Sequence, residues 1–240
     1  PIQRVWQDGI WQVNGRFSQT WRFADINYSL ASYEDQRDMF TSYCGVLNSL
    51  PTGATAKITI NNRRLNGTDF QHSVLMRLKG DGLDKYRQEY NGILMEKAVE
   101  SNNLIQDKYI TISVERKNIE EARTFFKRVD IDLGKSFGKL DSGAKALDNH
   151  ERLRIFHDFF RPGEEQDFRI DLSEAMKRGH SFKDAIAPDG MQFKADHFEI
   201  GGKVGRVLFL REYASYIKDR MITDLSDFSR NLMLSIDILP

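Results

Sequence analysis

The spacing of apolar residues changes along this chain, and that change constrains the fold more than any other feature. Apolar and polar residues alternate from Thr55 to Asn61 and again from Lys108 to Glu115. A period of two places successive side chains on opposite faces, which is typical of a half-buried strand. Around these segments the apolar residues recur at three and four positions, the spacing of amphipathic helices. The chain is therefore expected to combine strands and helices.

Two of the helical segments carry a start signal. Ser32 is followed three residues later by Asp35, and Asn118 by Glu121, which is the spacing of a capping residue and its partner. The first of these helices is expected to end before Pro51. The apolar residues at helical spacing are Met39, Phe40, Tyr43, Leu47 and Leu50 in the first helix and Ala122, Phe125, Phe126, Val129 and Leu133 in the second.

The opening residues indicate β-hairpins. Turn signals at Asp8-Gly9 and Asn14-Gly15 separate short runs of strand-forming residues. The expected strands are Val5–Gln7, Ile10–Val13 and Thr20–Asn27. Tryptophans alternate through these hairpins, so we expect one face to join the core and the other to be able to present a ring to a partner strand.

A last strand, expected from Arg206 to Leu210, would complete a β-α-β-β-α-β order. In that order, a polar helix from about Leu83 to Ser101 and the region from Ser142 to Gly202 are insertions. We therefore predict the α+β class, with a ferredoxin-like mixed sheet, helices packed on one face, a hairpin-rich amino terminus and helical insertions.

The expected division is a sheet-and-helix core at about 1–140, a helical or irregular insertion at about 141–202, and a returning strand, helix and final strand at about 203–240. The one linker-like stretch in the sequence runs from Lys139 to Ala146. The final apolar run, Ser226 to Leu239, needs a neighbouring strand. It either forms an edge of this sheet or begins another subdomain.

Composition excludes several classes of protein. Lys and Arg number 35 and so do Asp and Glu, so no basic field favours non-specific binding to nucleic acid. A single cysteine, Cys44, excludes an internal disulfide and a Cys-rich zinc site, and it fits a reducing compartment. No window approaches the roughly 18 to 20 consecutive apolar residues of a spanning helix, so we expect a soluble chain without a transmembrane segment.

Sequence motifs for catalysis are weak. Gly134-Lys135-Ser136 lacks the upstream glycine of a phosphate-binding loop, and it falls inside a predicted helix whose amides are already bonded. Gly201 to Gly205 reads as a hairpin turn rather than a nucleotide loop. His150 and His157 share a helix face, but a metal site would need further ligands, so a solvated or packing pair is expected. We expect no catalytic, nucleotide-binding or metal-ligating residue.

Five residues are candidates for a partner interface, since aromatic and arginine side chains anchor interfaces. They are Trp6, Trp11, Arg152, Arg154 and Arg161. The simpler interpretation for all five is packing: the rings belong to the core of the hairpins, and the arginines form the solvated face of a helix over an aromatic core.

Three segments together resemble one family. They are RVWQDGIWQVNGRFSQTWRFADINYSLASYEDQRDMF from Arg4, NHERLRIFHDFFRPGEE from Asn149, and RVLFLREYASYIKDRMITDLSDFSRNLMLSIDILP from Arg206. They are similar to the amino-terminal region of the VirB-type or TraE-like conjugative-transfer ATPases of type IV secretion systems, most closely the branch carried by Gram-positive conjugative elements.

The resemblance implies a mixed α/β domain that is separate from the ATPase core. The chain, residues 1–240, is then expected to be a non-catalytic docking and assembly domain, because it begins without Met and stops at Pro240 before any Walker motif. ATP and magnesium would bind the absent carboxy-terminal domain. No residue of the family's nucleotide site can be placed on this sequence.

The resemblance also implies partners and a location. Expected partners are the chain's own carboxy-terminal ATPase domain, membrane-channel components and possible self-association, without direct DNA binding. The expected location is cytoplasmic, peripheral at the inner face of the membrane. The alternatives are a stand-alone adaptor and a single-stranded nucleic-acid-binding protein, because ferredoxin-like sheets often bind polynucleotides.

Overall fold

The structure is a computed structural model that describes residues 2–64, 74–100, 104–165, 168, 170–171, 177–212, 214–216, 218, 220–228 and 230–239. The chain divides into two compact units. The sheet unit comprises Pro1–Asn61, Gln106–Arg152 and Met233–Pro240, and the second unit comprises Asn62–Ile105 and Leu153–Leu232. The units interleave along the sequence, so neither coincides with the predicted core at about 1–140.

The structure belongs to the α+β class, as predicted. Its main sheet has the strand order β1-β2-β3-β5-β4-β10, and β6 also pairs with β3. The strands are β1 (Ile2–Val5), β2 (Trp11–Val13), β3 (Arg16–Phe23), β4 (Thr55–Arg64), β5 (Leu104–Glu115), β6 (Ala144–Ala146) and β10 (Leu232–Ile238). Helix α1 (Tyr33–Asn48) connects β3 to β4, and α4 (Ile119–Gly138) connects β5 to β6. Each helix thus links two strands that have a third strand between them, which is the split β-α-β arrangement of ferredoxin-like folds.

The predicted fourth strand of this arrangement is wrong. Residues Arg206 to Leu210 form no strand, and β6 occupies the expected place beside β3, with Trp21 opposite Ala146. The sequence does not reveal β6 because it is three residues long and contains two alanines, which have low strand propensity. It also lies within the stretch Lys139 to Ala146 that was predicted to be a linker.

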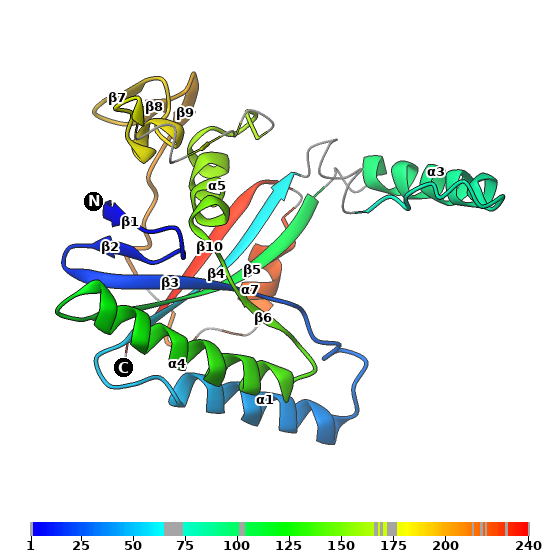
Figure 1. Ribbon diagram of the computed structural model, residues 1–240, viewed down its shortest axis with the longest axis horizontal. Coiled ribbons are helices and arrows are strands. Elements are labelled where there is room, and N and C mark those ends of the chain that lie inside the picture. The colour runs from blue at the N-terminus through cyan, green and yellow to red at the C-terminus, as the bar shows by residue number, and fades with distance from the viewer. Residues whose placement is uncertain are drawn as a thin grey trace. The chain divides into compact units, whose positions relative to one another are not determined.

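The helix start signals are confirmed. The Ser32 hydroxyl accepts a hydrogen bond from the Asp35 amide at 3.2 Å, and the Asn118 side chain accepts one from the Glu121 amide at 2.9 Å. Figure 1 shows α1 and α4 side by side on one face of the sheet. Rings of β3 pack against α4, where the Trp21 and Phe126 centroids lie 6.1 Å apart.

Two predicted faces need correction. In α1, Val46 is the buried residue and Phe40 is 62% exposed, because the adjacent Met39 and Phe40 point about 100° apart and cannot both face the sheet. In β4, Thr59 and Asn61 are buried as well as Ala56 and Ile58, so the strand is not half-buried. β4 is an interior strand, flanked by β5 and β10, so each of its side chains has strand neighbours on both sides along the face of the sheet.

The hairpin prediction is confirmed, with shifted bounds. Asn14 and Gly15 have φ values of 49° and 77°, the left-handed pair of a tight hairpin turn, and they join β2 to β3. β3 begins at Arg16, before the predicted Thr20, because its first residues pair with β2. At the other end of the chain, β10 joins this sheet beside β4, so the final apolar run forms a sheet edge here.

The second unit contains smaller elements. They are α3 (Asp84–Glu100), the greater part of α5 (Asn149–Phe160), the 3-10 helix η1 (Phe182–Ala185), the strands β7 (Met191–Phe193), β8 (Phe198–Ile200) and β9 (Lys203–Gly205), and α7 (Arg220–Ser226). The helix expected from Leu83 to Ser101 is confirmed as α3, although Ser101 lies outside the described residues. The region 141–202 was predicted to be helical or irregular, but it also holds β6, β7 and β8.

The glycine hairpin is confirmed. Gly201 and Gly202 have φ values of 52° and 74° and turn β8 into β9, with Ile200 opposite Lys203. The second strand is β9 rather than Arg206 to Leu210. No helix in the described part of the chain has the length and apolar character needed to cross a lipid bilayer.

Candidate interaction surfaces

Two of the five interface candidates, Trp11 and Arg152, form a buried cluster in the sheet unit. Trp11 is 1% exposed and Arg152 is 5% exposed. The Arg152 guanidinium lies 4.3 Å from the centre of the Trp11 ring and donates to the Gly9 carbonyl at 2.6 Å and the Ser18 carbonyl at 2.9 Å. The Trp11 indole N–H donates to Asn149 Oδ1 at 2.7 Å. The first turn of α5 is thereby bonded to the opening hairpins.

Burial has an electrostatic consequence for this cluster. It lowers the pKa of Arg152 to about 9, because an apolar environment disfavours the guanidinium cation. Cation–π contact with Trp11 and charge-assisted bonds to carbonyl oxygens offset part of that cost. Packing accounts for both residues, since neither side chain reaches the surface.

Trp6 also packs internally. Its ring centroid lies 5.8 Å from that of Phe17, and the residue is partly buried against the core cluster of the sheet unit. Trp21 is fully buried and donates to Asp130 Oδ1 at 2.7 Å. Trp21 is buried and Trp6 is partly buried, so neither ring is presented on the surface of the opening hairpins.

Arg154 and Arg161 belong to the second unit, where each has acidic neighbours. Arg154 Nε lies 3.8 Å from Asp158 Oδ2, one helical turn further along α5. Arg161 donates to the Ala187 carbonyl at 2.8 Å and to Glu164 Oε2 at 2.6 Å, and it also pairs with Asp189. Arg161 therefore joins the end of α5 to the segment that follows η1.

His157 is the buried member of the predicted histidine pair. Its Nδ1 lies 3.1 Å from Asp158 Oδ1, while His150 is exposed. Burial raises the pKa of Asp158, and the hydrogen bond with His157 and the charges of Arg154 and Arg63 oppose that shift. Among the residues that the structure describes, no three His, Cys, Asp or Glu side chains converge as metal ligands.

The Gly134-Lys135-Ser136 triplet lies inside α4, as predicted. The Lys135 carbonyl accepts a hydrogen bond from the Lys139 amide at 3.2 Å, so the backbone here closes a helical turn. A phosphate cradle needs amides that converge on an open turn, and helical amides are already bonded.

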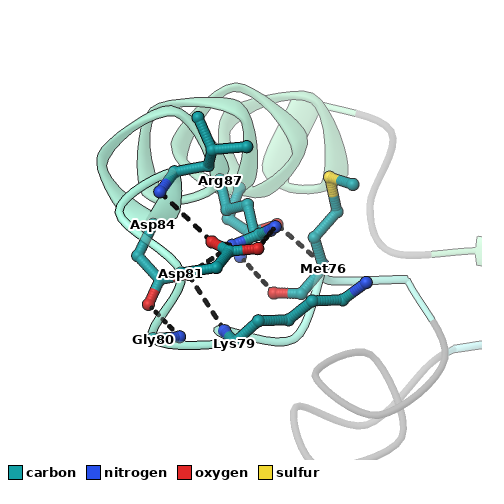
Figure 2. A network of polar contacts seen from close by, with 8 residues as sticks. Met76, Lys79, Gly80, Asp81, Asp84 and Arg87 are labelled. Atoms are coloured by element: carbon teal, nitrogen blue, oxygen red, sulfur yellow. Dashed lines mark hydrogen bonds and ion pairs between the residues drawn. The ribbon is translucent and has the colours of Figure 1, made fainter.

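The α3 segment, residues 74–97, is one exposed surface. Figure 2 shows the polar network that fixes the loop before α3. Arg87 donates to Asp84 at 2.6 Å and to Asp81 at 2.6 Å, while Asp84 accepts from the amides of Lys79 and Gly80 at 3.0 and 2.8 Å. The side-chain hydrogen bond from Arg87 lowers the pKa of Asp81 to about 2.

The start of this loop, at Met76, is fixed by the side-chain amide of Asn91. Asn91 accepts from the Met76 amide at 2.8 Å and donates to the Met76 carbonyl at 2.9 Å. The ordered segment nevertheless leaves large apolar side chains exposed, namely Val74, Met76, Leu78, Leu83, Tyr86, Tyr90, Ile93 and Met95. Its polar bonds therefore order a surface rather than close a core.

A second exposed surface is the apolar segment Val207–Leu210. These four residues have no regular secondary structure, and their exposed fractions lie between 64% and 85%. Four consecutive exposed apolar residues are unusual in a chain that stands alone.

A third surface is the α1 groove, a cavity of about 290 Å³ in the sheet unit. It is lined by residues between Phe23 and Tyr28, by Met39, Phe40 and Tyr43 in the middle of α1, and by Phe137, Leu140 and Ser142 at and just after the end of α4. No sequence pattern predicted this groove, because it forms only where α1 and α4 pack together. The available signal was Tyr28, a large side chain just before a helix start.

Comparison of the sequence with known proteins identifies no related protein. No protein-family model matches the chain, and no curated protein sequence matches it either. The resemblance to conjugative-transfer ATPases therefore stays a prediction from the three segments quoted above.

Proposed function

We propose that this chain is a docking and assembly domain of a conjugative-transfer ATPase of a type IV secretion system, with ATP hydrolysis carried out by another domain. The observation that carries the proposal is the apolar segment Val207–Leu210, whose four side chains are largely exposed. Burial of apolar surface drives association at roughly 25 cal/mol per Å², so such a segment favours a protein that works through contacts.

The α3 segment supports the same proposal. Its loop is fixed by Arg87 and Asn91, so these bonds order the loop backbone that carries exposed apolar residues before any partner arrives. Preordered surfaces bind more tightly because less conformational entropy is lost on association. Partners of this kind would be the ATPase domain and the channel components that the resemblance implies.

The competing proposal, binding of single-stranded nucleic acid, lacks a stacking platform in the described strands. Sheets that bind RNA or DNA present aromatic rings on their central strands. The positions of β3 and β5 that face away from α4 include Ser18, Thr20, Thr111 and Ser113, with Thr20 and Thr111 hydrogen-bonded at 2.8 Å. The ring on this face, Tyr109, is only 6% exposed, so it offers no open surface for a base to stack on. Equal numbers of basic and acidic residues also give no general attraction to phosphates.

A competition experiment in donor cells tests the proposal. Overproduction of this chain in a cell that carries the matching conjugative element should occupy docking sites and lower transfer frequency by about tenfold, by mass action. The matched control is the Trp21→Asp variant, which places a charge in the core and should not fold. Unchanged transfer, with the folded chain present at high level, would contradict the docking role.

The non-catalytic part of the proposal has its own measurement. Calorimetric titration of the purified chain with ATP and magnesium should give no saturable heat of binding. Saturable binding to this chain would show that a nucleotide site exists outside the expected domain.

A further inference from the structure

The apolar segment Val207–Leu210 exposes its backbone as well as its side chains. It follows closely after β9 and forms no helix or strand (Figure 1). Within the part of the chain that the structure describes, none of its amides or carbonyls has a hydrogen-bond partner. Water can bond to these groups while the segment is exposed. A partner that buries the four side chains removes that water, so it must supply backbone donors and acceptors of its own.

A helix would pair these groups within the segment, but the sequence does not favour one. Successive residues of an α-helix lie about 100° apart, so four consecutive apolar residues cover most of its circumference rather than one face. A helix this short is also unstable by itself. Val207 and Phe209 have high strand propensity, and no residue of the segment has a positive φ. Pairing with another strand is therefore the favoured way to bury it.

As a strand, the segment would be apolar on both faces. Val207 and Phe209 would point to one side and Leu208 and Leu210 to the other, because successive side chains of a strand alternate. A strand with water on one side needs only one apolar face, whereas a strand with two apolar faces is buried on both. The segment thus fits a cleft in which a strand edge is covered above and below.

Arginines flank the segment and disfavour pairing between two copies of it. Arg206 donates to the Asp196 carbonyl at 3.2 Å and lies 3.6 Å from Asp196 Oδ2, while Arg211 is exposed. In an antiparallel pair of two such segments, Arg206 would lie opposite Arg211. In a parallel pair in register, each arginine would lie beside its own copy. Like charges directly opposite each other are destabilising, so an edge with acidic residues at these positions is a better partner.

We propose that Val207–Leu210 adds as a strand to an open sheet edge of a partner protein, in an apolar cleft with acidic residues at its ends. The inference rests on the proposed function for its source of partners. Backbone hydrogen bonds provide the affinity and pockets for alternate side chains provide the specificity, as in other cases of β-strand addition. Arg206 anchors the start of the segment to Asp196, so the strand is presented from a fixed point.

The probe is a cyclic β-hairpin peptide that carries valines along one open edge, a glutamate at each end of that edge and a fluorescent label. Titration with the full chain, followed by fluorescence anisotropy, should show saturable binding. The same peptide with N-methylated amides along its open edge should not bind, because it keeps the side chains but loses the donors. Arg211→Glu should weaken binding by about fivefold, since it places like charges together.

A proline scan separates strand addition from docking by side chains alone. In an added strand the N–H groups of alternate residues face the partner edge, so proline should matter at every second position. One pair of variants, either Val207→Pro and Phe209→Pro or Leu208→Pro and Leu210→Pro, should each weaken binding by about tenfold. The other pair should have a smaller effect. Equal effects at all four positions would overturn the inference.

The matched control is Ala214→Pro, at an exposed position that also lies outside helices and strands, and it should bind as the unchanged chain does. Circular dichroism of the four proline variants should match that of the parent, because the segment has no regular structure to lose. No saturable binding of the hairpin, or equal binding of its N-methylated form, would contradict strand addition. Self-association in sedimentation experiments that the proline variants abolish would instead identify a second copy as the partner.

The donor-cell competition separates this inference from the proposed function. If the parent chain lowers conjugative transfer and all four proline variants lower it equally, the docking role stands and strand addition fails. If no form of the chain affects transfer but the hairpin binds with alternating proline effects, strand addition stands and the proposed function fails.

Discussion

Two arginines of this chain, Arg152 in the sheet unit and Arg87 in the α3 segment, each organise a network, but in opposite environments. Arg152 is buried, bonds to backbone carbonyls, and has a pKa lowered to about 9 by the loss of water. Arg87 bonds to the carboxylates of Asp81 and Asp84, and these raise its pKa above the ordinary value. The buried network stabilises the fold, whereas the exposed one orders a surface.

Polar bonds stabilise the whole fold in one of these networks and order a surface loop in the other. Buried donors and acceptors must be paired or the folded state loses stability, so removal of Arg152 affects the whole sheet unit. Ion pairs at the surface contribute little to global stability because water and salt screen them. Substitutions in the two networks should therefore differ both in size and in the part of the chain that responds.

The largest expected effect lies at Gly9, whose carbonyl accepts from Arg152. Gly9 has a φ of 80°, and a Cβ added there would lie 2.0 Å from the Leu147 carbonyl oxygen. Gly9→Ala should lower the free energy of unfolding by about 4 kcal/mol or more, measured by urea denaturation. The control is Gly15→Ala, with a similar φ of 77° but no atom within 4 Å, which should cost only about 1 kcal/mol. Similar losses at both positions would mean that the close approach to Leu147 is not what matters.

The next effect is expected at Arg152 itself. Arg152→Met keeps an unbranched apolar stem over the Trp11 ring but leaves the carbonyls of Gly9 and Ser18 without this donor. We expect a loss of about 2–3 kcal/mol in the free energy of unfolding. A stability equal to or above that of the parent would show that the cost of burying the charge exceeds the value of its bonds, an outcome known for some buried ion pairs.

A local effect is expected at Arg87. Arg87→Met should leave the melting temperature of the chain nearly unchanged, because its partners Asp81 and Asp84 stay partly exposed to water and the bonds order only the loop before α3. Amide hydrogen exchange should accelerate at Lys79 and Gly80, whose N–H groups donate to the Asp84 carboxylate that Arg87 holds. Lys85→Met, an equal loss of charge on the same helix, should not change exchange at these two amides.

The smallest effect is a pH dependence in the second unit. Burial raises the pKa of Asp158 above its ordinary value of 3.8, so the folded chain keeps this proton where the unfolded chain has lost it. The contribution of Asp158 to the free energy of unfolding therefore falls as pH rises from 3.8, the pKa in the unfolded chain, to the higher pKa of the folded chain. Asp158→Asn should remove this slope in urea unfolding measured from about pH 4 to about pH 7. An unchanged slope would mean that His157 and Arg154 hold the carboxylate ionised.

The local features of the fold were predictable from the sequence. Ser32 and Asn118 mark helix starts through bonds that span three residues, and the alternation in Lys108 to Glu115 marks a strand through its own side chains. Strand β6 was not predictable, because its short alanine-rich sequence becomes a strand only through pairing with β3. Conversely, Val207–Leu210 has the composition of a strand but pairs with no strand among the residues that the structure describes.

The sites were predictable to a lesser degree. Trp11 and Arg152 were candidates for a partner interface, with internal packing as the simpler interpretation, and both are buried. They meet across 141 positions, and a sequence pattern does not show whether such residues contact each other or a partner. The α1 groove depends on the packing of α1 against α4 and has no motif. Of the large side chains near the start of α1, Tyr28 is the one that lines it.

Strands β4 and β5 are neighbours in the sheet, yet about 40 residues, including the whole of α3, connect them. Closing a loop of that length instead of a short hairpin costs only about 2 kcal/mol, because the entropy of closure grows with the logarithm of loop length. The sheet therefore places little constraint on what the connection contains. A lineage of such chains can lengthen, shorten or replace the α3 segment and so change partners while the framework of β3, β5 and β4 stays the same.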